Sequence, residues 1–300
     1  MDLITIVGPT ATGKTSLAVN LAYKIDGEII SADSRQVYRD MNIGTGKDYY
    51  DYVIKEKQIP CHLIDIVEAG YEYNVYEYQK DFLKVFNDIK QRKKQAVLCG
   101  GTGLYVEAVL KGYKLLRVPP NQKLREKLSE KSQHELIERL SNFKNLHNKT
   151  DTENRKRLER AIEIETYYDE HKEHSDYPQI NTKIFATKVE RDELRKKITT
   201  RLKQRLDEGM IDEVKTLINK GIKADKLKYY GLEYKFITQF VLGEINYNDM
   251  FQRLNSSIHQ FSKRQMTWFR KMQRDGFEIT WIDVNLPMDE KIEIIINDCQ

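Results

Sequence analysis

The stretch GPTATGKT, residues 8–15, decides the fold. It matches the pattern Gly-x-x-x-x-Gly-Lys-Ser/Thr in full, through Gly8, Gly13, Lys14 and Thr15. The apolar segment LITIVG precedes it, and KTSLAVNLAYKI, with apolar residues at helical spacing, follows it. This is the strand–loop–helix setting in which backbone N–H groups and a helix N-terminus surround phosphate oxygens. The motif predicts a phosphate-binding loop, and it leaves open whether the phosphate is transferred or left behind.

Further strand-like segments alternate with helical ones. They lie in GEIISADS (27–34), CHLIDIV (61–67), QAVLCGGTGLY (95–105), KIFATKV (183–189) and FEITWIDV (277–284). This alternation predicts an α/β fold, a P-loop NTPase-like parallel sheet flanked by helices. Ligands of such sheets bind at the carboxyl ends of the strands, so we expect the loop, Asp33 and Thr102 around one crevice.

A helical insertion is predicted between the two halves of this core. From Val118 to about Asn181 the strand signal stops, and apolar residues recur at helical spacing. The predicted domains are residues 1–117, the first part of the P-loop core; 118–182, the helical insertion; and 183–300, the second part with C-terminal helices and a closing strand. The apolar residues of the insertion are Leu124, Leu128, Leu136, Ile137 and Leu140.

The composition of the chain argues against a membrane protein and a secreted protein. The chain has 300 residues, 40% hydrophobic and 32% charged, and no apolar run approaches the ~20 residues of a membrane helix. The N-terminus lacks a basic region before its apolar segment, so we expect a cytoplasmic protein without membrane contact. Neither a coiled coil nor a long exposed apolar stripe is evident, which favours a monomer without an obligate protein partner. The three cysteines have no metal-ligand spacing.

The distribution of basic residues says more about a polyanionic partner than the net charge does. Fifty Lys plus Arg oppose 46 Asp plus Glu, a net charge of +4. Basic residues gather at 154–160, 195–205 and 262–274. A single cluster of this kind is most often a solvated helix face, but three together favour a nucleic-acid surface.

Several individual residues could have more than one role. In a phosphate loop Lys14 neutralises phosphate charge, and the Thr15 hydroxyl occupies the usual Mg²⁺ position. Asp33 could be a Mg²⁺ ligand, a general base or a helix cap. The Thr102 turn either contacts a ligand or only joins a strand to a helix, and Asp65 either holds Mg²⁺ or is structural. The loop itself suits an ATP-dependent small-molecule kinase or a non-catalytic RNA-binding protein as well.

Seven segments together are more specific. GPTATGKT, SADSRQVYRDMNIGTGK, HLIDI, GGTGLY, RLERAIEIE, RLDEGMIDEV and KRQMTWFR occur in this order, and over almost the whole chain they resemble the tRNA dimethylallyltransferase family. The resemblance implies transfer of the dimethylallyl group from dimethylallyl diphosphate to N6 of the adenosine at position 37 of tRNA, beside the anticodon. Diphosphate is then the leaving group, held by the loop and Mg²⁺.

The resemblance also implies roles for particular residues. Asp33 corresponds to the general base, and Thr102 to a hydroxyl beside the reacting centre. The implied diphosphate-binding residues are Gly8, Thr10, Ala11, Thr12, Gly13, Lys14, Thr15 and Lys228, with Thr15 also a metal ligand. The implied tRNA-binding residues are Asp33, Ser34, Arg35, Gln36, Arg125, Arg157, Arg160, Lys263, Arg264 and Arg270.

The chain departs from the family pattern at a few positions. Lys228 stands where an arginine is often found, and Lys is not equivalent to a bidentate Arg at a diphosphate. Gly231-Leu232-Glu233-Tyr234 replaces Gly-Tyr-[Lys/Arg]-[Glu/Gln]. Gly46 replaces a usual alanine, and Cys61-His62 replaces a His-His pair.

Overall fold

A computed structural model of the chain describes residues 1–143, 154–171 and 177–300. It divides into two compact units, one of Met1–Gly112 with Gln179–Gln300 and the other of Tyr113–Pro178. These divisions fall a few residues before the predicted boundaries at 117 and 182. The reason is local: the Tyr168 hydroxyl accepts the N–H of Leu116, and Arg160 donates to the carbonyl of Val118, which ties this segment to the second unit.

The larger unit is built on one parallel sheet in the order β5-β2-β6-β1-β7-β8, which confirms the predicted fold class. The central strand β1 pairs with β6 on one side and β7 on the other, and all five of its residues are buried. Burial on both faces explains its continuous apolar sequence. The strands are β1 (Leu3–Val7), β2 (Gly27–Ser31), β5 (Cys61–His62), β6 (Gln95–Gly100), β7 (Thr182–Lys188) and β8 (Ile279–Asp283).

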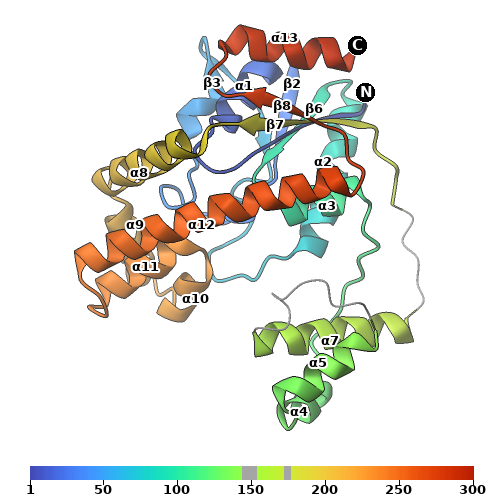
Figure 1. Cartoon of the computed structure of the whole chain (residues 1–300), viewed down its shortest axis with the longest axis vertical. Helices are drawn as coiled ribbons and strands as arrows, with labels where there is room; N and C mark the ends of the chain where they lie inside the picture. Colours follow the sequence, from blue (N-terminus) through green and yellow to red (C-terminus); the bar gives the residue numbers. More distant parts are fainter. Residues whose placement is uncertain (144–153, 172–176) are drawn as a thin grey trace. The chain divides into compact units, whose positions relative to one another are not determined.

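Helices cover both faces of this sheet (Figure 1). On one face α1 (Lys14–Lys24) and α13 (Met288–Cys299) pack together over apolar strand residues such as Ile6 and Phe185. On the other face lie α2 (Val75–Gln91) and α3 (Gly103–Leu110), which contact each other. The sheet is therefore closed to solvent on its faces, and its strand ends are left for a site. A short 3-10 helix, η1 (Tyr49–Tyr52), and a hairpin of β3 (Val53–Ile54) and β4 (Lys57–Gln58) precede β5.

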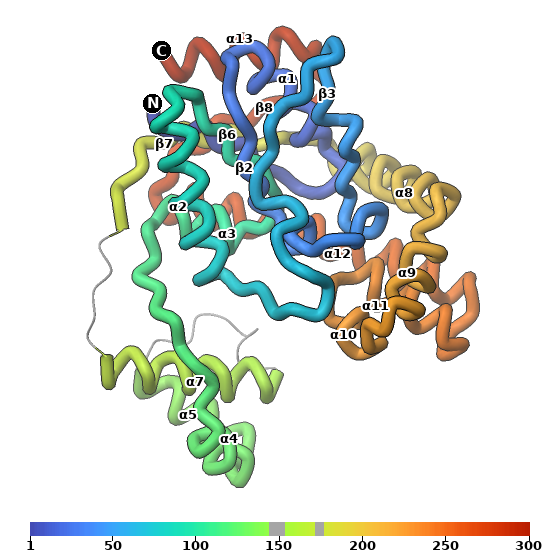
Figure 2. Tube along the Cα trace, turned by 180° about the vertical axis from the view of Figure 1, so that it is seen from behind, coloured from blue at the N-terminus to red at the C-terminus, as the bar shows by residue number. Residues whose placement is uncertain are grey.

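A second core lies beside the sheet, where Figure 2 shows α8 to α11 gathered next to α12. The basic cluster at 195–205 lies in α8, and a separate helix, α9, follows it, because Gly209 adopts φ +99°, a conformation that favours glycine. The helices are α8 (Arg191–Asp207), α9 (Met210–Asn219), α10 (Ala224–Tyr229), α11 (Leu232–Val241) and α12 (Tyr247–Arg274). None of the helices in the described part of the chain is long and apolar enough to cross a membrane.

The smaller unit is helical, with α4 (Gln122–Ser129), α5 (Gln133–Ser141) and α7 (Arg155–Glu170). Ser132 and Glu135 form a capping box at the start of α5, so its first N–H groups are satisfied locally. The core consists of residues predicted from helical spacing, joined by two from α7. Its buried members are Leu124, Leu128, Leu136, Leu140, Leu158 and Ile162, with Ile137 packed against them.

Candidate active site

The phosphate loop runs from Gly8 to Gly13, between the end of β1 and the start of α1. Gly13 has φ +73°, and a Cβ on Gly8 would lie 1.9 Å from the Thr187 hydroxyl of β7. The Thr12 hydroxyl donates to the Pro9 carbonyl at 2.8 Å and lies 2.8 Å from the Thr187 hydroxyl. The loop is therefore held closely against β7 at its base, and glycine at position 8 is required by this close approach.

Lys14 and Thr15 open helix α1 at the end of the loop. The Lys14 ammonium lies 3.4 Å from the Pro9 carbonyl, and its burial lowers its pKa. Asp33 and Arg201 are near enough to shift this pKa as well, Asp33 upward and Arg201 downward. A partly desolvated cation within a cradle of backbone amides is suited to bind an anion.

Asp33 and Thr102 follow the neighbouring strands β2 and β6, so the structure brings them together as expected from the strand order. The Thr102 hydroxyl accepts the N–H of Ser34 at 3.0 Å. A Cβ on Gly100 would lie 2.3 Å from the Ala32 carbonyl, so the glycine permits this approach of the two strand ends. Thr102 therefore touches the segment that carries Asp33.

The Asp33 carboxylate is oriented by its own turn. Its Oδ1 accepts the N–H of Arg35 at 2.8 Å, and the segment that follows is a series of turns. The helix-cap alternative for Asp33 is therefore wrong, because no helix begins here. Among the described residues, the Arg35 N–H is the donor to this carboxylate, and it contacts Oδ1 and not Oδ2.

The next two residues have different surroundings. The guanidinium of Arg35 lies 5.8 Å from the ring centre of Tyr229. Gln36 is buried, accepts from the Ser31 hydroxyl at 3.1 Å and donates to the Gly46 carbonyl at 3.0 Å. The Gln36 side chain thus holds the loop around Gly46, whereas Asp33, Ser34 and Arg35 are partly exposed.

Helix α12 reaches the phosphate loop through Gln265, a residue for which no sequence motif predicted a role. Its Oε1 accepts the N–H of Thr10, and its Nε2 donates to the carbonyl of Gly101, both at 2.9 Å. Trp268 of the same helix packs on Gly103, where a Cβ would lie 2.4 Å from its ring, and Phe269 is fully buried. The predicted tRNA-binding residues Lys263, Arg264 and Arg270 are exposed on this helix.

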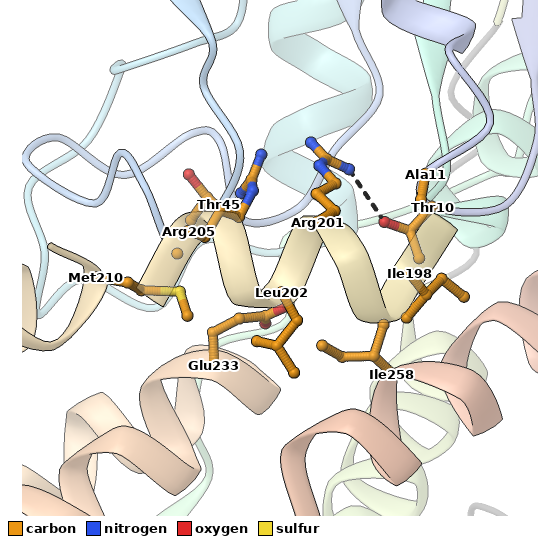
Figure 3. A pocket seen from close by; sticks show the side chains of 11 residues that line it. Thr10, Ala11, Thr45, Ile198, Arg201, Leu202, Arg205, Met210, Glu233 and Ile258 are labelled. Carbon is orange, nitrogen blue, oxygen red and sulfur yellow. Dashed lines mark hydrogen bonds between the residues drawn. The ribbon is translucent and has the colours of Figure 1, made fainter. Parts of the chain in front are cut away.

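Helix α8 supplies two further arginines, which the sequence places in a basic cluster without a predicted role. Arg201 and Arg205 line a pocket with Thr10 and Ala11 of the phosphate loop (Figure 3). Ile198, Leu202, Met210 and Ile258 form an apolar part of its wall, and Gly44, Thr45 and Glu233 complete it. A recognisable signal exists: two arginines four residues apart share a helix face beside apolar residues at 198 and 202.

The predicted diphosphate ligand Lys228 is paired with a carboxylate. It lies on α10, and its ammonium contacts Oε1 of Glu244 at 2.5 Å. Lys228 does not line the pocket beside the phosphate loop, whose arginines come from α8. Asp65 is paired with the buried Lys47 and with Tyr49, which supports the structural alternative for this carboxylate.

In the smaller unit, two of the predicted tRNA-binding arginines are bound to one carboxylate. Arg125 contacts Glu163 with two hydrogen bonds of 3.0 and 2.9 Å, and Arg160 contacts the same side chain. Burial acts to raise the pKa of Glu163, but the bonds from Arg125, the Asn121 N–H and Arg160 outweigh it and lower this pKa. Arg157 is exposed near the start of α7.

A metal ion at this site would have few protein ligands. Within the described ranges no three His, Cys, Asp or Glu side chains cluster to hold a metal. Mg²⁺ commonly keeps one or two protein ligands and takes its other oxygens from substrate phosphates and water. Thr15, in the first turn of α1, carries a hydroxyl that could supply such a ligand.

Comparisons with known proteins identify the family. The sequence model of the IPP transferase family matches residues 36–272. The chain is 57% identical to tRNA dimethylallyltransferase 2 of Phocaeicola vulgatus over 297 residues, which is 99% of this chain and 97% of the relative. It is 56% identical to the protein of the same name in Bacteroides fragilis, over 98% of this chain and 96% of that one.

Solved structures agree with this result. The tRNA isopentenylpyrophosphate transferase of Bacillus halodurans matches with a TM-score of 0.72 and 32% identity, over 99% of this chain and 95% of that one. A eukaryotic dimethylallyltransferase acting on tRNA shares the fold, with a TM-score of 0.76 and 21% identity over 94% of this chain and 73% of that one. The family resemblance read from the seven segments is confirmed: the chain belongs to the IPP transferase family and is a prenyltransferase.

Proposed function

We propose that the protein transfers the dimethylallyl group from dimethylallyl diphosphate to N6 of the adenosine at position 37 of tRNA. The N6–C1 bond forms, the bond from C1 to the diphosphate oxygen breaks, and diphosphate leaves with that electron pair. The observation that carries this proposal is the meeting of the phosphate loop, Asp33 and Thr102 at the ends of β1, β2 and β6. The names of the relatives support the substrates.

At the donor end, the loop stabilises a leaving group. Negative charge develops on the diphosphate as the C–O bond breaks, and preorganised donors stabilise such charge most strongly where water is excluded. The backbone amides between Gly8 and Thr15 and the Lys14 ammonium are suited to this role. Mg²⁺ bound at Thr15 would supply further neutralisation of the diphosphate charge. The loop then acts on a departing group, which answers the question that the motif left open.

At the acceptor end, Asp33 is suited to take the N6 proton. The adenine amine is a weak nucleophile because its lone pair is delocalised into the ring, so a positioned base lowers the barrier. The Arg35 N–H fixes Oδ1 at 2.8 Å, and Oδ2 is left to accept the proton. The Thr102 hydroxyl, which is already joined to the Ser34 N–H, would lie beside the reacting amine.

The adenosine has to leave its stack to reach Asp33. Extruding a base costs a few kcal/mol, so the tRNA must be held by contacts elsewhere. The exposed Lys263, Arg264 and Arg270 are suited to contact phosphates at the larger unit. Arg125, Arg157 and Arg160 are suited to contact phosphates from the helical insertion. Glu163 fixes the orientation of Arg125 and Arg160.

A labelled-donor assay tests this proposal. Purified protein is incubated with Mg²⁺ and unmodified tRNA, and with either labelled dimethylallyl diphosphate or γ-labelled ATP, and the digested nucleosides are analysed by mass. Dimethyl-allylated adenosine is expected. Phosphate label from ATP in an acceptor would instead identify a kinase, and transfer from neither donor would favour a non-catalytic RNA-binding protein.

A further inference from the structure

We propose that Arg201 is the side chain that binds the terminal phosphate of the diphosphate, in the role that the family resemblance gave to Lys228, and that Arg205 and Asp48 position it. This inference rests on the proposed function, since it names further residues of the same site. It is carried by the position of Arg201, by the charges around it and by the contacts of Arg205.

Arg201 faces the phosphate loop. Its Nη1 lies 3.4 Å from the Thr10 hydroxyl, and both residues line the pocket of Figure 3, where the guanidinium points toward Thr10. Arg201 also lies near enough to Lys14 to influence its ionisation. Two cations, one from α1 and one from α8, therefore converge on the same loop.

The positive charge in this pocket is only partly balanced. Arg201 and Arg205 share a single carboxylate, with distances of 3.3 and 3.1 Å from their Nη2 atoms to Oδ2 of Asp48. Glu233 also lines the pocket, and burial raises its pKa, which favours its neutral form relative to a solvated carboxyl group. Two guanidinium groups on one carboxylate leave a site that favours an anion.

Arg205 has the contacts of a positioning residue. It is 8% exposed, and it donates to the carbonyl of Ile43 in addition to contacting Asp48. A Cβ on Gly46 would lie 2.6 Å from Nη2 of Arg205 and 2.8 Å from Nη2 of Arg201. Glycine in place of the family's usual alanine thus makes room for both guanidinium groups, and its φ of +73° also favours glycine.

Lys228 has another partner. Its ammonium forms an ion pair with Glu244 at 2.5 Å, so diphosphate would have to displace this carboxylate to bind there. Arg201 instead shares its carboxylate, Asp48, with Arg205, and its planar group can give a phosphate two parallel hydrogen bonds.

Calorimetric titration with inorganic pyrophosphate and Mg²⁺ tests the assignment. We expect Arg201→Met to weaken binding by about 10- to 100-fold, as the loss of a charge-assisted hydrogen bond does. Lys228→Met should bind within about twofold of the unchanged protein. Lys215→Met, which removes a surface ion pair on α9, is the control, and thermal unfolding confirms that each variant is folded.

A double-mutant cycle tests the positioning role. If Arg205 acts through Arg201, the single substitution Arg205→Met weakens pyrophosphate binding. In a protein that already carries Arg201→Met, the same substitution causes no further loss. If the affinity loss of the double variant equalled the product of the two single losses, Arg205 would act independently of Arg201, and its assignment as a positioning residue would be overturned. Strong loss in Lys228→Met with wild-type binding in Arg201→Met would overturn the assignment of Arg201.

The outcomes separate this inference from the proposed function. Prenyl transfer by the unchanged protein together with normal pyrophosphate binding by Arg201→Met would reject only the role of Arg201. Weak pyrophosphate binding by Arg201→Met, in a protein that transfers no prenyl group to tRNA, would reject only the proposed reaction.

Discussion

Gln265 of α12 is joined to Thr10 of the phosphate loop by a hydrogen bond of 2.9 Å that links positions 255 residues apart in the sequence. The other end of the same amide donates to Gly101, in the turn before Thr102. One buried side chain therefore fixes the distance between the loop proposed to hold the leaving group and the turn beside the proposed base. The same helix carries the exposed basic residues proposed to contact tRNA.

Replacing Gln265 should loosen this link. Gln265→Leu leaves the Thr10 N–H and the Gly101 carbonyl without their partner in a site where the side chain is 6% exposed. We expect the free energy of unfolding to fall by about 1–3 kcal/mol and kcat/KM for the prenyl donor to fall as well. Denaturant titration and steady-state kinetics measure the two effects. Gln260→Leu, at an exposed position of the same helix, should change neither, and equal effects in both variants would contradict the role of the bridge.

Asp33→Asn separates a general base from a turn residue. An asparagine side-chain oxygen can still accept the N–H of Arg35, so the local turn is retained while the proton acceptor is lost. We expect the rate of prenyl transfer to fall by ~100- to 10,000-fold with tRNA affinity nearly unchanged. Single-turnover rates and tRNA binding by fluorescence anisotropy provide the measurement. A variant that retained the rate would exclude Asp33 as the base.

Glu163 should stabilise the smaller unit. It is 2% exposed and accepts from Arg125, Arg160 and the Asn121 N–H, so it joins α4 to α7. Glu163→Gln removes the charge that both arginines share, and removing one member of a buried ionic network is destabilising. We expect faster hydrogen exchange in α4, α5 and α7, with the sheet of the larger unit unchanged. Glu138→Gln, at an exposed position of α5, is the control, and faster exchange throughout the chain would argue against a local role.

The sequence predicted those parts of the site that are determined by residues close together in the chain. A motif between an apolar run and an amphipathic helix indicates a phosphate loop, and the strand order then brings Asp33 and Thr102 beside it. Arg201 and Gln265 reach the loop from 191 and 255 residues away. Helical spacing shows that α8 and α12 are amphipathic, but it does not show which polar side chain meets the loop. The partner of Lys228 is likewise a tertiary contact, with a carboxylate that follows the end of α11.

The ion pair of Glu28 and Arg92 makes the stability of the folded protein depend on pH. Arg92 Nη2 lies 2.9 Å from Glu28 Oε2, and His62 Nε2 lies 2.7 Å from the same oxygen. The hydrogen bond from Arg92 lowers the pKa of Glu28, against the opposing effect of burial. A carboxyl group whose pKa is lower in the folded state contributes stability above its unfolded pKa, near 4.5, and loses it as the pH falls through the folded value.

Arg92→Met should therefore lower Tm most at neutral pH. We expect a decrease of ~1–3 °C at pH 7, a modest value because the arginine side chain is 42% exposed. The difference from the unchanged protein should shrink as the pH is lowered below 4.5, because the carboxylate then becomes protonated in both proteins. Thermal unfolding followed by circular dichroism from pH 7 to pH 3.5 measures it. Lys84→Met, at an exposed position of α2, the helix that ends just before Arg92, controls for the loss of a positive surface charge. A Tm difference for Arg92→Met that grew on acidification would reject the assignment.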